Sequence, residues 1–148
     1  MSIWAAQGTQ TAGSKTALVV VSTAAIRPRI LEHTYSNVGT VSTDAQFEIQ
    51  AKRFTAAGTN TSVTPAPTDP SEGTPVMAFG SNSTVEPTYT ANTTLFDTGV
   101  NPRGIFRWTA YDPSAEIILP ATASSGVGYF LNALGGAVTV IVDVKVRQ

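Results

Sequence analysis

The chain has 148 residues, a length that suits one domain burying roughly two-thirds of the surface of its extended form. Hydrophobic residues make up 42% and charged residues 13%, with a net charge of −1, so the composition supplies a core but no basic surface for nucleic acid. The absence of cysteine excludes disulfides and thiolate chemistry, and no apolar run approaches the ~20 residues of a membrane span. We expect a soluble protein without a cleaved signal peptide, rich in strands because threonine, glycine and proline abound.

Residues 1–14 predict an extended N-terminal arm that precedes a single domain of residues 15–148. In this arm, small polar residues and two glycines follow one apolar pair, Ile3 and Trp4. Terminal segments stay mobile unless something ties them down. The pair therefore either folds back on its own core or docks into a neighbouring subunit, and otherwise the arm is disordered. Ile3 and Trp4 are the arm's candidate partner-binding residues.

Three strands are predicted in the first third of the domain. Residues 15–23 form a continuous β-branched run, which is typical of a buried strand. In residues 26–35 the apolar positions change parity, which predicts a bulge near Ile30 and Leu31. After a turn at 37–44, residues 45–54 alternate cleanly between apolar and polar side chains, as expected for a strand with one buried face.

Residues 56–75 predict one long irregular segment, in which a short strand can begin only at Val63. Four prolines prevent a regular interior ladder, and polyproline-like stretches can lie along a partner at little cost in ordering entropy. Loops of this length are usually functional or mobile. We therefore take as candidate partner-binding residues the prolines Pro65, Pro67, Pro70 and Pro75.

The second half of the chain predicts a β-hairpin over residues 103–122, with arms at 105–111 and 116–119 around Asp112-Pro113-Ser114. Its large apolar face carries Phe106 and Trp108, which we expect in the core. Short strands are also predicted at 86–90 and 93–98, joined at Ala91-Asn92, and at 129–131. A turn at 134–136 leads to the last strand, 137–147, with valines on one face.

Eight or nine short strands without a helix predict an all-β fold, an antiparallel β-sandwich or barrel. A jelly-roll-like sandwich is preferred, although strand count alone leaves other Greek-key arrangements open.

No residue pattern points to catalysis, a metal or a cofactor. The one histidine, His33, lies in a predicted strand and is interpreted as structural, and no serine stands in a nucleophile-elbow pattern. The acids are scattered, and Asp69 and Glu72 lack the ligand ladder of a calcium loop. Sugar binding would need exposed aromatic faces, for which the candidates are Trp4, Tyr89, Tyr111 and Tyr129.

Several motifs together resemble a known family. They are EPTYTAN at 86–92, NPRGIFRW at 101–108, EIILPAT at 116–122 and GVG at 126–128, with weaker likeness at 46–58. These stretches resemble small structural proteins of tailed-bacteriophage virions, similar to capsid decoration (cement) proteins. None of the matching residues is catalytic, so the resemblance implies a class of structural protein rather than an active site.

The resemblance implies a β-sandwich subunit, made in the host cytoplasm and bound as a homotrimer to the outside of a capsid, with the major capsid protein as partner. It implies no enzyme activity, small-molecule substrate, cofactor, nucleic acid or membrane partner. The alternatives are a carbohydrate-binding or host-attachment β-sandwich module and a tail or neck structural protein. An enzyme using scattered carboxylates is a weaker alternative, which would need two acids about 5–10 Å apart in a cleft.

Overall fold

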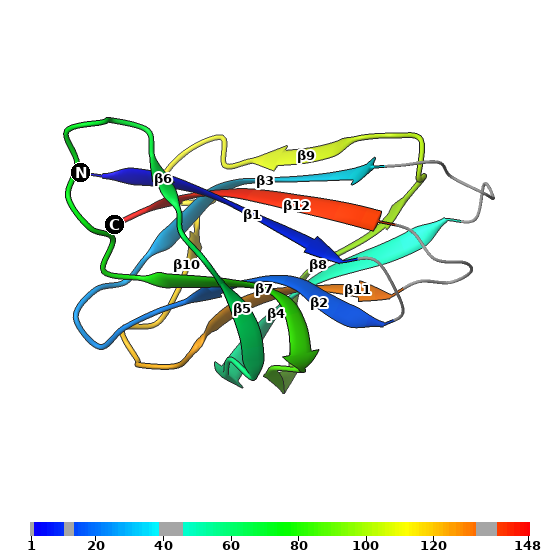
Figure 1. Ribbon diagram of the computed structural model, residues 1–148, viewed down its shortest axis with the longest axis horizontal. Coiled ribbons are helices and arrows are strands. Elements are labelled where there is room, and N and C mark those ends of the chain that lie inside the picture. The colour runs from blue at the N-terminus through cyan, green and yellow to red at the C-terminus, as the bar shows by residue number, and fades with distance from the viewer. Residues whose placement is uncertain (1, 11–13, 39–45, 133–138) are drawn as a thin grey trace.

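The computed structural model describes residues 2–10, 14–38, 46–132 and 139–148, which form two antiparallel sheets packed together (Figure 1). Sheet A contains β1 (Ile3–Gln10), β3 (Arg29–Val38), β6 (Ala66–Pro67), β9 (Phe106–Thr109), β10 (Ile117–Ile118) and β12 (Thr139–Arg147). Sheet B contains β2 (Lys15–Val21), β4 (Phe47–Ala56), β5 (Thr59–Val63), β7 (Ala78–Val85), β8 (Thr88–Val100) and β11 (Gly126–Asn132). The predicted all-β sandwich is confirmed, with twelve strands in the described part of the chain instead of eight or nine.

The strand order brings the two ends of the described chain together. Sheet A runs β10-β3-β12-β1-β6, with β9 also beside β3, and sheet B runs β5-β7-β2-β11-β4-β8. The first and last strands pair along their whole length, from Ile3 opposite Arg147 to Gln10 opposite Val140. Both chain ends therefore lie at the same end of the sandwich (Figure 1).

The core lies between the sheets and follows the period-two patterns of the sequence. Along β12, burial is confined to the face that carries Val140, Val142, Val144 and Val146. The predicted inward residues of β4, Phe47, Ile49 and Ala51, are at most 2% exposed. The bulge near Ile30 is confirmed, because Lys145 pairs with Glu32 and the next residue, Val146, pairs with Ile30. Ala45, Val138 and most of the turns predicted at 37–44 and 134–136 lie outside the described residues.

Ile3–Gln10, predicted as part of an N-terminal arm, form β1 inside sheet A, so this part of the arm folds back on its own core, the first of the outcomes expected for it. Trp4 is 2% exposed and belongs to the core. The sequence signal was weak because the other inward residues of β1 are the small Ala6 and Gly8 and the polar Gln10. Gly8 leaves no room for a side chain, because a Cβ there would lie 2.4 Å from the carbonyl oxygen of Ala17 on β2.

The predicted irregular segment 56–75 contains two strands that connect the sheets. β5 pairs with β7 in sheet B, and β6 pairs with β1 in sheet A, placing Pro67 opposite Trp4. A proline fits here because β6 is a two-residue edge strand, which needs few ladder hydrogen bonds. The parts of this segment outside β5 and β6, residues 57–58, 64–65 and 68–75, are irregular, as predicted.

The predicted hairpin is wrong, although its turn is present. Asp112 accepts hydrogen bonds from Ser114 N at 2.6 Å and, through its carbonyl, from Ala115 N at 3.1 Å. However, β9 and β10 pair with successive parts of β3 rather than with each other. The turn residues therefore connect β9 to β10, which pair with β3 one after the other along the same edge. Each short strand pairs with β3 because β3 is a longer partner than the other short strand.

The two strands predicted on either side of Ala91-Asn92 form one strand, β8. Asn92 has a φ of 59°, and the pairing of β8 with β4 changes register beside it, opposite Lys52 and Phe54. Asparagine tolerates this left-handed conformation better than most residues, so the chain continues through an irregularity instead of turning back.

Candidate interaction surface

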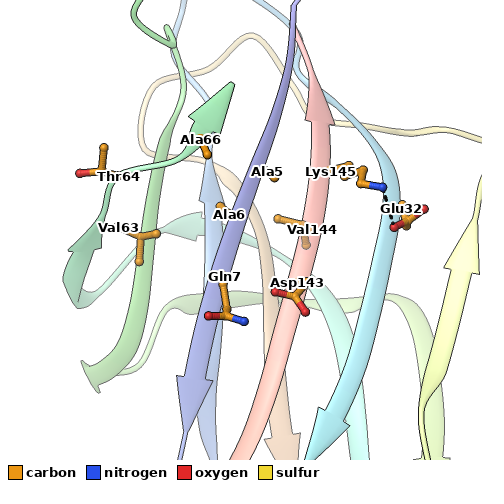
Figure 2. A pocket seen from close by; sticks show the side chains of 10 residues that line it. All are labelled: Ala5, Ala6, Gln7, Glu32, Val63, Thr64, Ala66, Asp143, Val144 and Lys145. Atoms are coloured by element: carbon orange, nitrogen blue, oxygen red, sulfur yellow. Dashed lines mark ion pairs between the residues drawn. The ribbon is translucent and has the colours of Figure 1, made fainter. Parts of the chain in front are cut away.

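A groove crosses the outer face of sheet A beside the β5–β6 connection (Figure 2). Because Trp4 and Ala6 face the core, Ala5 and Gln7 face outward, and they pair with Lys145 and Asp143 on β12. The opposite wall lies on the side of β1 away from β12. It is formed by the β5–β6 connection, with Val63, Thr64 and Ala66. The groove has a volume of about 600 Å³. It combines the alkyl groups of Ala5, Val63 and Ala66 with the polar side chains of Gln7, Thr64, Asp143 and Lys145.

Of the charged side chains that line this groove, Glu32 and Lys145 form an ion pair, whereas Asp143 does not. Glu32 on β3 lies 3.2 Å from Lys145 Nζ and 2.5 Å from Arg107 Nη2. Partial burial raises the pKa of Glu32, but its hydrogen bonds with Arg107 and Lys145 hold the net pKa below the ordinary value. Glu32 and Lys145 therefore satisfy each other at one wall. Asp143, beside Gln7, forms no ion pair within the described part of the chain.

A groove with an unpaired carboxylate, an amide and alkyl groups is suited to a polypeptide segment that carries a basic side chain. The edge of β1 adds a second element of recognition. β6 pairs only with Trp4 and Ala5, so within the described residues the rest of β1 lacks a strand on that side. The Ile3 carbonyl accepts a hydrogen bond from Thr68 N at 2.9 Å, so the backbone groups of Ile3 point away from β12. Backbone direction alternates along a strand, so the N–H and C=O groups of Gln7 point toward the same side, where no strand pairs with them among the described residues.

The predicted partner-binding residues are only partly brought together. Pro65 and Pro67 are half-buried and flank Ala66 at the groove wall, whereas Pro70 and Pro75 lie farther along the segment between β6 and β7. Ile3 is half-buried at the start of β1, and Trp4 points into the core. Sequence reasoning did not single out Gln7, Asp143 or Lys145. The alternation of β12 placed the last two outward, but nothing local indicated the opposite wall.

A second ion-pair cluster secures the edge near β10. Glu116 accepts from Arg29 Nη1 at 3.2 Å and pairs through both carboxylate oxygens with Arg147 Nη2. The Glu116 side chain is only 5% exposed. A hollow of about 310 Å³ lies beside this cluster, lined by Arg27, Arg29, Arg147 and Gln148. Because Arg29 and Arg147 already pair with Glu116, the cluster's evident effect is to hold β3, β10 and β12 together.

His33 is enclosed by aromatic rings rather than placed in a cleft. Its ring stacks on Tyr35 and Trp108, with centroids 5.0 and 4.9 Å away, and contacts Phe96 edge-on. Burial lowers the pKa of His33 to about 4, although nearby Glu32 opposes this shift. The Tyr129 hydroxyl lies 3.5 Å from Nδ1, and Nε2 has no hydrogen-bond partner. His33 is therefore a neutral core residue.

The structure separates the four aromatic residues considered for sugar stacking. Trp4 and Tyr129 are buried, and Tyr89 is half-buried with its hydroxyl 2.6 Å from Thr16 Oγ1. Tyr111 is 86% exposed. One exposed ring does not form a stacking platform, so this arrangement gives the carbohydrate-binding alternative no support.

Asp69 and Glu72, the acids closest to a calcium-loop pattern, have other partners. Asp69 accepts from Ser71 N at 2.9 Å, and Glu72 accepts from the Ser2 hydroxyl. Across residues 2–10, 14–38, 46–132 and 139–148, no three His, Asp or Glu side chains gather in a way that could hold a metal ion.

Comparison of the chain with protein-family models, curated proteins and solved structures found no match. The described residues contain no helix with the length and apolar character needed to cross a membrane.

Proposed function

We propose that this protein is a structural virion protein that binds the outside of a tailed-bacteriophage capsid and stabilises it. The groove on sheet A is the observation that carries the proposal, since it combines an open strand edge with an unpaired carboxylate. The sequence resemblance supports the same role. Its motifs lie between residues 86 and 128, with the weaker likeness at 46–58, and include none of the residues that line the groove, which leaves the groove free to vary with the partner.

In this proposal the partner is an extended segment of the major capsid protein. The segment lies along β1 where β6 ends, hydrogen-bonds to the open backbone and directs a basic side chain to Asp143. Pro65 and Pro67 keep the opposite wall in place. As the resemblance implies, three copies would act together, which multiplies the contacts made with one lattice.

The sandwich is proposed to be a jelly roll. The strand orders β1-β12-β3-β9 and β2-β11-β4-β8 support this topology, because they are the two four-stranded sets that two Greek keys form. β5 and β7 then extend the second set beyond β2, and β6 extends the first beyond β1.

Stabilisation would arise by mass action, because the protein binds the assembled lattice and not the separated capsid subunits. The test uses mature capsids of the encoding phage from which the protein has been removed. We expect the purified protein to co-sediment with them and to raise their melting temperature as its concentration increases. A failure to bind, or binding that leaves capsid melting unchanged, would contradict the proposed function.

A matched pair of variants tests the groove. Asp143→Lys places a positive charge where a basic side chain is expected, so capsid binding should weaken at least tenfold, roughly 1.4 kcal/mol. Asp97→Lys makes the same change in charge on an exposed residue of β8, in the other sheet, and should bind like the unmodified protein. Equal binding by both variants would exclude the groove as the contact surface.

A further inference from the structure

β9 is an open edge of sheet A. Within the described residues it pairs only with β3, and it forms the upper border of the sandwich in Figure 1. The Ala110 N–H donates to the Leu31 carbonyl at 2.8 Å, so the even-numbered residues direct their backbone groups toward β3. By alternation, Arg107 and Thr109 direct their N–H and C=O groups away from the sheet. An open edge of this kind is a template for another strand.

Two large apolar side chains flank this open edge. Ile105 is 76% exposed just before β9, and Tyr111 is 86% exposed just after it. They share the parity of Arg107 and Thr109, whereas Phe106 and Trp108 face inward and pack against the core. Charged residues often protect an edge from pairing, but Arg107 is already held by Glu32 at 2.5 Å. The edge therefore exposes apolar groups at both ends and unused backbone hydrogen bonds between them.

We propose that β9 pairs antiparallel with β9 of a second copy, about a two-fold axis that passes beside Trp108. In this register Ile105 lies opposite Tyr111 of the second copy, and Arg107 lies opposite Thr109. Both kinds of pair use the residues whose backbone groups are open, as hydrogen-bonded antiparallel pairs require. The contact is isologous, so each apolar pair and each polar pair occurs twice.

Charge selects this register over its neighbours. Within each copy, Thr109 on β9 lies opposite Glu32 on β3. In the proposed register, Arg107 of one copy therefore lies in one cross-strand row with Thr109 and Glu32 of the second copy. The row thus places the Arg107 cation and the Glu32 carboxylate of the second copy on either side of the neutral Thr109. An axis beside Arg107 would place two arginines opposite each other, which is unfavourable. An axis beside Thr109 would place Ile105 opposite Pro113 and leave Tyr111 without its apolar partner.

This contact is independent of the capsid role and of the three-fold association implied by the resemblance. A two-fold edge contact makes a dimer of single copies, or joins larger assemblies in pairs. It also removes one open edge of the sandwich, which lowers the risk of uncontrolled strand addition.

Cysteine cross-linking tests the register, because the chain has no cysteine of its own. We expect a mixture of Ile105→Cys and Tyr111→Cys proteins to form a disulfide-linked dimer on mild oxidation. Either variant alone should link at least tenfold less, and Val85→Cys, exposed on β7, should not link to Ile105→Cys. Equal linking by Ile105→Cys alone, or no linking in the mixture, would overturn the proposal.

A proline at the open edge provides the second test. Thr109→Pro removes an N–H that points away from β3, so the fold should persist while pairing between copies is lost. Thr109→Val keeps the N–H and is the control. By sedimentation equilibrium, the natural chain and Thr109→Val should show twice the 15.4 kDa subunit mass or an even multiple of it. Thr109→Pro should halve that mass. An unchanged mass for Thr109→Pro, or a natural chain that stays monomeric, would refute the contact.

Discussion

The burial of His33 makes the stability of the folded protein depend on pH. The imidazole is 0% exposed and lies between the rings of Tyr35 and Trp108, an environment that disfavours its charged form. The Tyr129 hydroxyl lies 3.5 Å from its Nδ1, and the charge of the adjacent Glu32 opposes the effect of burial on the pKa of His33. The folded protein therefore binds a proton at His33 only at much lower pH than the unfolded chain.

This difference predicts a loss of stability in mild acid. His33 has a pKa of about 4 when folded against 6.5 when unfolded, so its contribution is complete above pH 6.5 and is lost as pH falls toward 4. The loss amounts to about 3 kcal/mol. His33→Phe keeps an aromatic ring in the stack and lacks this titration. Urea unfolding at pH 7 and pH 4 should show a decrease smaller by that amount in the variant, and an equal decrease in both proteins would contradict the assignment.

Trp4 distinguishes a core strand from a mobile arm. It is 2% exposed, and its indole nitrogen has no hydrogen-bond partner, so its contribution comes from apolar packing. We expect Trp4→Ala to lower the free energy of unfolding by about 3–5 kcal/mol. Trp4→Phe should cost clearly less, since it keeps a ring and removes an unpaired buried N–H. Thermal unfolding measures both, and a change below about 0.5 kcal/mol for Trp4→Ala would mean that β1 is not part of the stable fold.

At the scale of elements, local pattern predicted the strands that bury one large apolar face. β4, β12 and the bulge at Leu31 follow from residue parity alone. For β7, the sequence indicates only a short apolar run at 76–79 that suits a strand or a helical turn, because residues 81–84 are polar. β1 was missed because Ala6 and Gly8 are small. For β9 and β10, the error concerned partners rather than strands. Turn chemistry was correctly recognised at Asp112, but a turn does not specify that the flanking strands pair with each other.

Gly126 lies where sheet B has no room for a side chain. β11 lies between β2 and β4, and a Cβ on Gly126 would stand 1.9 Å from the Val20 carbonyl oxygen and 2.8 Å from the Phe54 ring. Because backbone cannot move aside as a flexible side chain can, Gly126→Ala should destabilise the fold by about 2 kcal/mol or more. Gly73→Ala is the control, since no atom lies within 4 Å of the added carbon. Chemical denaturation of both variants checks this, and similar midpoints would contradict the packing described for β11.

At the scale of the whole molecule, the groove was not predictable from local sequence. Its lining comes from β1, β3, β12 and the β5–β6 connection, four parts of the chain that are separated in sequence. Residue parity placed Asp143 and Lys145 on the outer face of β12, and the prolines of segment 56–75 were recognised as a possible contact region. The sequence did not indicate that this segment crosses from sheet B to sheet A. The crossing depends on the tertiary pairing of polar strands, and such strands have a weak local signal.

The same long-range pairing should govern how the chain folds. β1 and β12 are adjacent in sheet A but lie at opposite ends of the sequence, so their pairing closes the longest loop in the protein. The Gln148 N–H lies 3.0 Å from the Ser2 carbonyl oxygen, close enough for a short glycine linker to join the two ends. A circular permutant with that linker, opened at the exposed Gly73, converts the pair into a local hairpin. Since folding slows as contacts become less local, we expect stopped-flow refolding to accelerate by about tenfold. The control is the natural order of strands with the same linker inserted at Gly73, which should refold at the original rate. A permutant of equal stability that folds no faster would show that β1 and β12 pair only after the rate-limiting step.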